Sequence, residues 1–298
     1  MIAYDYNIHY VPEIPLAKTS KISLKNTITI KHSTHLAWEE PLAYKWPFYN
    51  NQGRDITLFT ERAFTRTEKE QLWVFDIEDV MTFFWKSGTL TLEYVPQKNF
   101  TQYLLQYWSL HIVLPLLLSI EEKYDFLHAG AVEVGNRPIL FVAESFGGKS
   151  TLTDFFMKQG HTMISDDKVA VYEENNAFLA VPSHPYHRPH RKMEDLGYFV
   201  DNVATSPEAI RVIYELERAD PTADIYIREL NGIEKFKSLR YSSEINLSFL
   251  KTKRFIFLTH LAKVVPVYKI TVPWDIERLP EVYNTIVRHC KTIQVSEE

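Results

Sequence analysis

The segment of residues 139–167, ILFVAESFGGKSTLTDFFMKQGHTMISDD, constrains the fold of this chain more than any other. It opens with an apolar run typical of a buried strand and passes through small residues to Lys149 and Ser150. A helical pattern then covers residues 151–159, and Gly160 stands where a helix would end. A short apolar strand leads to two aspartates. This order of strand, loop, helix and strand is typical of α/β folds that hold a phosphate group at the loop.

The loop matches a phosphate-binding pattern (P-loop) in part. The strict form is G-x-x-x-x-G-K-[ST], in which glycines let backbone N–H groups converge on phosphates, the lysine reaches the terminal phosphates and the hydroxyl holds Mg²⁺. Lys149 and Ser150 follow a glycine as the pattern requires, whereas Ala143 takes the place of the first glycine and Phe146 lies inside the loop. A Gly-Gly turn beside a solvated lysine is the alternative. We assign nucleotide binding to Ser145, Phe146, Gly147, Gly148, Lys149, Ser150 and Thr151.

Asp166 and Asp167 end the short strand that follows the expected helix. In α/β sheets the carboxyl ends of the strands carry the chemistry, and adjacent residues of a strand point to opposite sides. One carboxylate can therefore take the proton of a hydroxyl group while the other supports a Mg²⁺ ion held by Ser150. A solvated Asp-Asp turn is the alternative. Beside a phosphate-binding loop, the pair favours phosphoryl transfer.

Residues 181–192, VPSHPYHRPHRK, form a segment rich in histidine and basic residues. Its prolines prevent one regular helix, so the equal spacing of the histidines does not place them on one face. Three alternatives stay open: a zinc site, a solvated basic loop, and recognition of phosphate or of an acidic substrate. For the third, Arg188 is the first candidate because its planar guanidinium binds phosphate through two hydrogen bonds. The histidines are His184, His187 and His190, and weaker cationic candidates are Arg191, Lys192 and the more distant Arg240.

The composition predicts a globular protein that binds no nucleic acid. Of the 298 residues 45% are hydrophobic, and 33 Lys and Arg against 38 Asp and Glu give a net charge of −5, with the basic residues spread along the chain. Cys290 is the only cysteine, which excludes an internal disulfide and agrees with a cytoplasmic location. Residues 1–10 lack the pattern of a secretory signal. Residues 104–120 are apolar, but polar residues interrupt them, and we expect a buried helix there and no membrane span.

We expect two domains, a β-rich N-terminal domain over residues 1–98 and an α/β domain over residues 99–298. The first reads mainly as short strands, with KISLKNTITIKH, ITLFTERAFT, LWVFDI and GTLTLEYV as the clearest. A long apolar helical pattern over residues 99–123 is expected to bridge the two halves.

The second domain is expected to combine strands and helices. Two strands joined by a turn at Gly135 and Asn136 lead into the loop segment. Residues 204–217 and 228–239 show mostly helical patterns, and we expect a helical lid at about 200–250. Strands at RFIFLTH and VPVYKITVP and a helix over residues 277–288 complete the chain.

Three segments, LHAGAV, ESFGGKSTL and GHTMISDD, resemble those of the HPr serine kinase/phosphorylase family and of its shorter relatives encoded beside peptide-modification genes. The resemblance covers residues 126–189 and continues more weakly through VPVYKITVP. It implies an α/β P-loop kinase core, of the HPr kinase/PEP carboxykinase-like type, that uses ATP and Mg²⁺. By resemblance, His128 lies at the active site, Asp166 is the base and Asp167 is the metal-side carboxylate. Lys149 and Ser150 take the roles of the ATP and Mg²⁺ ligands.

The chain also departs from that family. Glycines are usual where Ala143 and Phe146 stand, and the downstream glycine-containing signature of the bifunctional enzymes has no equivalent here. These departures argue against phosphorolysis and against HPr itself as the substrate. The P-S-x-P-x-x-R stretch of the shorter relatives is matched in the basic segment, which implies that Arg188 stabilises charge on the transferred phosphoryl group. The matching residues are Pro182, Ser183, Pro185 and Arg188.

The sequence and the resemblance together predict an ATP- and Mg²⁺-dependent kinase that acts on a serine hydroxyl of a peptide or small protein. The shorter relatives suggest a lasso precursor peptide, modified at its C-terminal serine. Two alternatives remain: a nucleotide-binding regulatory protein that transfers no phosphate, and a kinase for a small-molecule hydroxyl. The resemblance and the β-rich first half also favour a homo-oligomer.

Overall fold

The fold is taken from a computed structural model that describes residues 1–15, 24–34, 44–47, 54–62, 70–144, 146–189, 192, 194–243 and 247–293. The chain divides into two compact units. The first comprises Met1–Lys123 and His190–Gly197, and the second comprises Tyr124–Pro189 and Tyr198–Glu298. This division differs from the expected boundary at residue 98, because the long apolar helix that follows belongs to the first unit.

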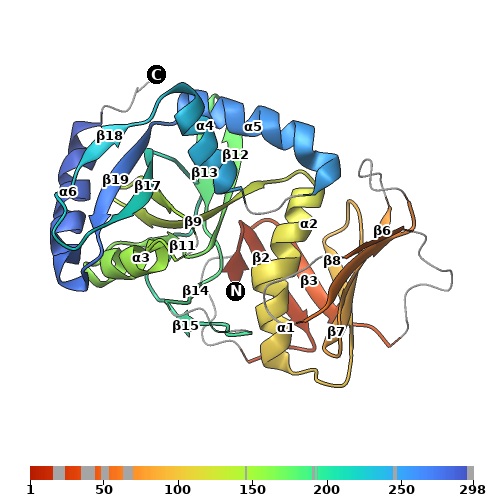
Figure 1. Cartoon of the computed structure of the whole chain (residues 1–298). Helices are drawn as coiled ribbons and strands as arrows, with labels where there is room; N and C mark the ends of the chain where they lie inside the picture. The colour runs from red at the N-terminus through yellow and green to blue at the C-terminus, as the bar shows by residue number, and fades with distance from the viewer. Residues whose placement is uncertain are drawn as a thin grey trace. The chain divides into compact units, whose positions relative to one another are not determined.

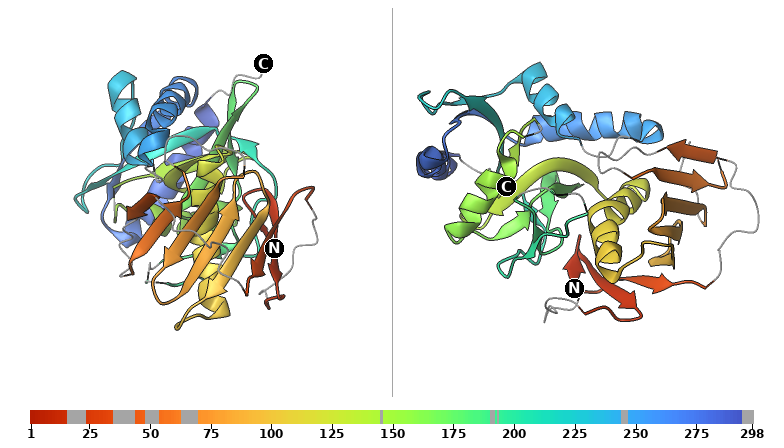
Figure 2. Two further views of the ribbon diagram at one scale, coloured as in Figure 1. Left: turned by 90° about the vertical axis from the view of Figure 1, so that its right-hand side faces the viewer. Right: turned by 60° about the horizontal axis from the view of Figure 1, so that its bottom comes forward.

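The first unit is built on an eight-stranded sheet in the order β1-β2-β3-β8-β7-β6-β5-β4. Its orange strands lie side by side in the left view of Figure 2. The strands are short and rich in aromatic and β-branched residues, which suits a half-buried pleated surface. Their bounds are β1 Ile2–Ala3, β2 Tyr6–Val11, β3 Thr27–His32, β4 Tyr44–Pro47, β5 Ile56–Thr60, β6 Leu72–Ile77, β7 Met81–Lys86 and β8 Thr91–Pro96.

A long buried helix packs in the same unit, made of α1 (Gln102–Trp108), the π-helical turn η1 (Ser109–Val113) and α2 (Leu114–Ile120). By length and composition it is the one helix of the described residues that could cross a membrane, and 89% of its most apolar window is buried inside the protein. The Tyr4 hydroxyl donates to the Leu110 carbonyl, which fixes the helix to the N-terminal strands. The prediction of a buried helix is therefore confirmed.

The second unit has a mixed sheet in the order β16-β13-β12-β9-β10-β17-β19-β18, with β11 paired to β9. Strands β10, β17 and β19 are parallel, and β9 runs antiparallel to β10. A separate pair, β14 and β15, lies outside this sheet. The bounds are β9 Asp125–Glu133, β10 Pro138–Val142, β11 Met163–Ser165, β12 Lys168–Glu174, β13 Ala177–Val181, β14 Tyr186–His187, β15 Tyr198–Phe199, β16 Glu208–Ala209, β17 Val212–Ala219, β18 Ile227–Glu229 and β19 Val267–Pro273.

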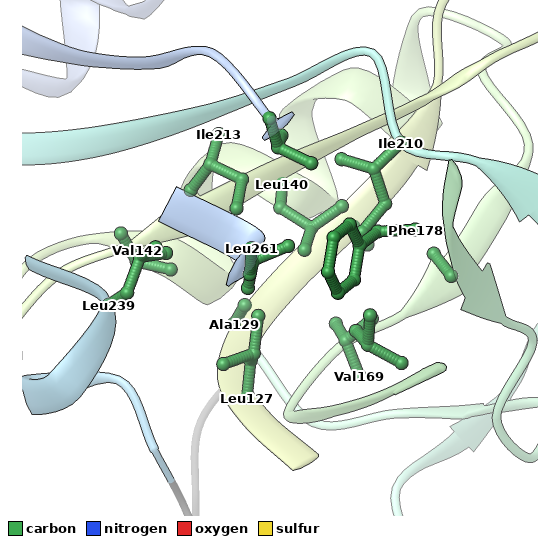
Figure 3. Packing of buried hydrophobic residues seen from close by; sticks show 14 of the residues in the cluster. Leu127, Ala129, Leu140, Val142, Val169, Phe178, Ile210, Ile213, Leu239 and Leu261 are labelled. Carbon is green, nitrogen blue, oxygen red and sulfur yellow. The ribbon is translucent and has the colours of Figure 1, made fainter. Parts of the chain in front are cut away.

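Helices cover both faces of this sheet (Figure 1). On one face, α3 (Lys149–Lys158) and α6 (Leu279–Thr292) pack their apolar residues against β10, β17 and β19. On the other face, α4 (Gly232–Tyr241) and α5 (Lys251–Val264) do the same. Figure 3 shows this second core, in which Leu239 and Leu261 from the helices meet Leu140, Val142 and Ile213 from the strands. The short turns are η2 (Ser248–Leu250) and η3 (Ile276–Arg278).

Two sequence predictions are wrong in the second unit. Val212–Ala219 is a strand in the middle of the sheet and not part of a helical lid, so only α4 remains of the helical content expected in that region. Its charged residues suggested a surface helix, but pairing with β10 and β19 on both sides fixes it as a strand. The segment RFIFLTH, expected as a strand, lies in α5, where Leu258 and Leu261 place one helical face on the core.

Candidate functional site

The predicted site residues converge at one edge of the second unit's sheet, where β10 and β11 end and β9 begins. Ala129 pairs with Val142, the last residue of β10, and Ala131 pairs with Ser165, the last residue of β11. The Ala129 N–H donates to the Asp167 carbonyl at 3.1 Å. The loop after β10, the aspartates after β11 and His128 therefore meet at this edge.

The described residues between β10 and α3, 143, 144 and 146–148, lead directly into the helix. The Gly147 N–H donates to the Glu144 carbonyl, and Gly148 takes a left-handed φ of 89° as the N-cap of the helix. Lys149 begins the helix, and its buried ammonium donates to the carbonyls of Ala143 at 2.9 Å and Glu144 at 3.3 Å. The Lys149 ammonium therefore links two carbonyls of the loop and holds the loop closed.

The structure explains the departure at Ala143, whereas Phe146 takes a backbone conformation that favours glycine. A Cβ at Gly147 would lie 2.6 Å from the Ala143 methyl and 2.9 Å from the Glu144 carbonyl oxygen, so Ala143 fits only because residue 147 is glycine. Phe146 is 94% exposed and has a left-handed φ of 61°, a conformation that favours glycine. Ser145 lies outside the described residues.

A second glycine lets α3 approach the sheet. A Cβ at Gly130 on β9 would lie only 2.0 Å from the Thr153 hydroxyl oxygen, which itself donates to the Lys149 carbonyl. The first turn of α3 presents Ser150, which is partly exposed, and Thr151, which is exposed. The N-terminus of the helix, with its unpaired N–H groups and positive dipole end, is thereby held at the sheet edge.

Arg188 holds the two predicted carboxylates together. Its backbone N–H donates to Asp166 Oδ2 at 2.7 Å, and its Nη2 donates to Asp167 Oδ2 at 2.8 Å. His128 Nδ1 lies 3.1 Å from Asp167 Oδ1. The Asp166 side chain is 3% exposed, whereas those of Asp167 and His128 are 11% and 21% exposed. The guanidinium compensates the Asp167 carboxylate and the backbone N–H binds that of Asp166, which makes their burial tolerable.

His187 ties Asp166 to helix α3, a link that the sequence analysis missed. Its side chain is fully buried, with Nδ1 3.0 Å from Asp166 Oδ1 and Nε2 3.4 Å from Asp154 Oδ1. Asp154 also accepts from the Tyr198 hydroxyl at 2.9 Å and pairs with Lys158. Burial raises the pKa of Asp154, but the hydrogen bonds from Lys158 and Tyr198 outweigh burial and lower it overall. No local sequence signal marks Asp154, because its partners are 33 or more residues away except for Lys158.

The described residues of the histidine-rich segment show no recognisable metal site. Burial lowers the pKa of His184 to about 3, so its imidazole is neutral at physiological pH. In the described part of the chain, no group of three or more His, Cys, Asp or Glu side chains is arranged to hold a metal ion. His190 and Arg191 lie outside the described residues, and Lys192 and Arg240 are exposed.

The residues assigned to Mg²⁺ fit that ion by their donor chemistry. The Ser150 hydroxyl and the Asp167 carboxylate are oxygen donors, which Mg²⁺ prefers, and Mg²⁺ commonly uses only one or two protein ligands beside phosphate oxygens and water. The Asp167 carboxylate also contacts His128 and Arg188, so these side chains would surround an ion bound there.

A pocket of about 280 Å³ opens beside the start of the loop. Ala143 and Glu144 form one side of it, Glu215 and Lys269 another, and residues of α4 such as Lys237 a third. Its mixed charge suits a polar ligand better than an apolar one.

Comparison with known proteins gives little beyond this geometry. No protein-family model matches the chain, and no curated protein matches its sequence. Among solved structures, the Hpr(Ser) kinase/phosphatase of Coxiella burnetii matches with 19% sequence identity and a TM-score of 0.34, over 56% of this chain and 95% of that one.

Proposed function

We propose that the chain is an ATP- and Mg²⁺-dependent kinase that transfers the γ-phosphate to a hydroxyl group, and that the acceptor is a serine of a peptide or small protein. One observation carries this proposal: the loop that begins α3 and the Asp166–Asp167–Arg188 cluster lie at the same sheet edge, and His187 connects Asp166 to α3 itself. Phosphoryl transfer needs these parts, namely an anion-binding loop, a base and a cation for the developing charge.

The loop and helix supply the phosphate site. The backbone N–H groups of residues 146–150 and the N-terminal end of α3 attract phosphate oxygens. The Lys149 ammonium donates to the loop carbonyls of Ala143 and Glu144, which holds it at the loop where the terminal phosphates would bind. Mg²⁺, held by Ser150 and Asp167, supplies neutralisation of the phosphate charge when it is bound.

The cluster supplies the chemistry of transfer. As the hydroxyl oxygen forms its bond to the γ-phosphorus, its proton passes to Asp166, and the bond between that phosphorus and the leaving ADP oxygen breaks. His187 and the Arg188 N–H orient the Asp166 carboxylate. The Arg188 guanidinium stabilises charge on the moving phosphoryl group. His128 lies beside Asp167, on the more exposed side of the pair.

The acceptor class rests on the resemblance to the shorter relatives of the HPr serine kinase/phosphorylase family. The shorter relatives point to a lasso precursor peptide phosphorylated at its C-terminal serine, in the cytoplasm. The pocket beside Ala143 offers space for a polar acceptor segment next to the loop.

A nucleotide-binding regulatory protein is the second candidate, and one observation favours it. Asp166 Oδ2 and Asp167 Oδ2 each accept a hydrogen bond from Arg188, and a histidine nitrogen lies 3.0 Å from Asp166 Oδ1 and 3.1 Å from Asp167 Oδ1, as expected for a network that only holds a loop in place. A kinase for a small-molecule hydroxyl would use the same cluster, and an acceptor panel distinguishes it.

The test is a time course with ATP, Mg²⁺ and a panel of serine-ending peptides and small hydroxyl compounds, followed by mass spectrometry for the gain of one phosphate. Asp166→Asn should lower turnover by about 10²- to 10⁴-fold, the usual contribution of a general base, while ATP affinity is kept. Asp167→Asn is the companion variant, because Asp167 is the more exposed carboxylate. Full turnover by Asp166→Asn would transfer the role of base to Asp167, and ATP binding without any product would favour the regulatory protein.

A further inference from the structure

An exposed tryptophan lies beside the loop, and the function proposed above does not use it. Trp274, just after β19, is 41% exposed, whereas the other tryptophans whose side chains the structure describes are 6% exposed or less. They are Trp73, Trp85 and Trp108. An indole that is left this exposed beside a ligand loop is better explained by a ligand than by packing.

The alternation of the strands places Trp274 on the same face of the sheet as α3. Along β17, Leu216 belongs to the core beneath α3 and α6, and Arg218 follows two residues later. Along β19, Val272 belongs to the same core, and Trp274 follows two residues later. Because side chains alternate along a strand, Arg218 and Trp274 lie on the same face of the sheet as this core. Both residues stand at the carboxyl ends of their strands.

Arg218 and Trp274 lie beyond the end of β10, beside the loop that follows this strand. Val142 ends β10 opposite Glu215, and β17 continues to Ala219, about 13 Å further at about 3.3 Å per residue. The loop turns into α3 within this distance. A Cβ placed on Gly148, the N-cap of α3, would lie 3.6 Å from Cζ3 of Trp274.

The chemistry of this pair suits a flat aromatic ligand. The Arg218 guanidinium carbon lies 3.9 Å from the centre of the Trp274 ring, so a cation covers one face of the indole. The part of the indole that stays exposed can stack on a nucleobase. Stacking tolerates different bases, because every base has a π-face.

We propose that Trp274, backed by Arg218, is the platform for the base of the nucleotide whose phosphates bind at residues 143–150. This inference rests on the proposed function and extends it, since it names the side chains that would hold the base of the nucleotide. The phosphates are held at the N-terminus of α3, and the base stacks on the indole next to Gly148.

Titration calorimetry with two ligands, Mg²⁺-ATP and Mg²⁺-tripolyphosphate, tests this on the full chain. The wild-type protein should bind ATP more tightly than tripolyphosphate. Trp274→Ala should weaken ATP binding by about 5- to 100-fold, the range expected for loss of one base–aromatic stack, and should leave tripolyphosphate affinity unchanged. Trp274→Phe, which keeps an aromatic ring, should retain most of the preference for ATP.

Tyr226→Ala is the matched control. Tyr226 is also an exposed aromatic residue, 64% accessible, but its neighbours Ile225 and Ile227 pack on the core beneath α3, so its ring faces the other way. This variant should bind both ligands as the wild type does.

The outcomes separate this inference from the proposed function. Equal wild-type affinities for the two ligands, or an ATP preference that survives Trp274→Ala, would overturn the platform and leave the phosphate site standing. Failure of the wild-type protein to bind either ligand would overturn both.

Discussion

At the scale of single residues, the site is a chain of contacts that links two histidines, one arginine and three carboxylates. Arg188 contacts both aspartates, His187 stands between Asp166 and Asp154, and His128 contacts Asp167. In a buried environment the loss of one member leaves its partner desolvated and unpaired, which costs more than the bond itself contributes.

Replacement of His187 tests this buried chain. His187→Leu should lower the free energy of unfolding of the second unit by about 1–3 kcal/mol, because the buried Asp166 carboxylate and the partly buried Asp154 carboxylate lose a partner. Urea denaturation followed by circular dichroism measures the change. His260→Gln is the control, since His260 pairs with Glu173 at 2.9 Å but is 40% exposed, and its loss should cost less than about 1 kcal/mol. Equal effects of the two variants would contradict a special role of burial.

His184 should make the protein acid-sensitive. Burial holds its folded pKa at about 3, below the ordinary value of 6.5, so between these values the unfolded chain binds more protons and stability falls as the pH falls. From pH 7 to pH 5 this one group should remove about 2 kcal/mol. Urea titrations at both pH values should show a smaller loss for His184→Gln than for the wild type. An identical pH dependence in the variant would mean that His184 is already protonated in the fold.

The sequence predicted part of this site and missed part of it. Asp166, Asp167 and Arg188 could be nominated because short motifs mark them, and the structure brings them together. The link through His187 to Asp154 could not, because it depends on where β14 lies relative to α3, and no periodicity encodes that. The roles of these residues stay predictions.

At the scale of secondary-structure elements, the site depends on how closely α3 packs on the sheet. The strand, loop and helix of residues 138–158 follow local sequence signals, and the prediction of these elements is confirmed. The strand at Val212–Ala219 and the helix at Lys251–Val264 were predicted wrongly, because pairing and packing with distant segments override local propensity there. Arg218, which covers one face of Trp274, lies on that mispredicted strand.

The contact between Gly130 and Thr153 tests the packing of α3 on β9. Gly130→Ala should destabilise the second unit by about 1–3 kcal/mol, since the new methyl group would lie against the Thr153 hydroxyl. Thr153→Ala removes that hydroxyl, so the double variant should lose less stability than the sum of the two single variants. A double-mutant cycle from urea denaturation measures this coupling. Additive losses would show that α3 shifts to accept the methyl group.

At the scale of the whole molecule, the chain leaves its second unit and re-enters it. Residues His190–Gly197 belong to the first unit, where the Glu194 carboxylate accepts hydrogen bonds from Arg54 and from the Trp108 indole at 3.0 Å. These partners are 140 and 86 residues away in sequence, so the expected boundary at residue 98 could not include them. The segment that follows Arg188 is therefore anchored by contacts in the first unit.

The central claim, a phosphate site formed by the loop and Lys149, is tested most directly by the affinity of the whole protein for Mg²⁺-ATP. Lys149→Ala should abolish binding measurable by titration calorimetry, because the ammonium both closes the loop and meets the terminal phosphates. The control is Lys263→Ala, an exposed lysine in the last turn of α5, which should bind as the wild type does. Loss of binding in Lys149→Ala alone is the predicted result, and unchanged affinity in a folded Lys149→Ala protein would contradict the account.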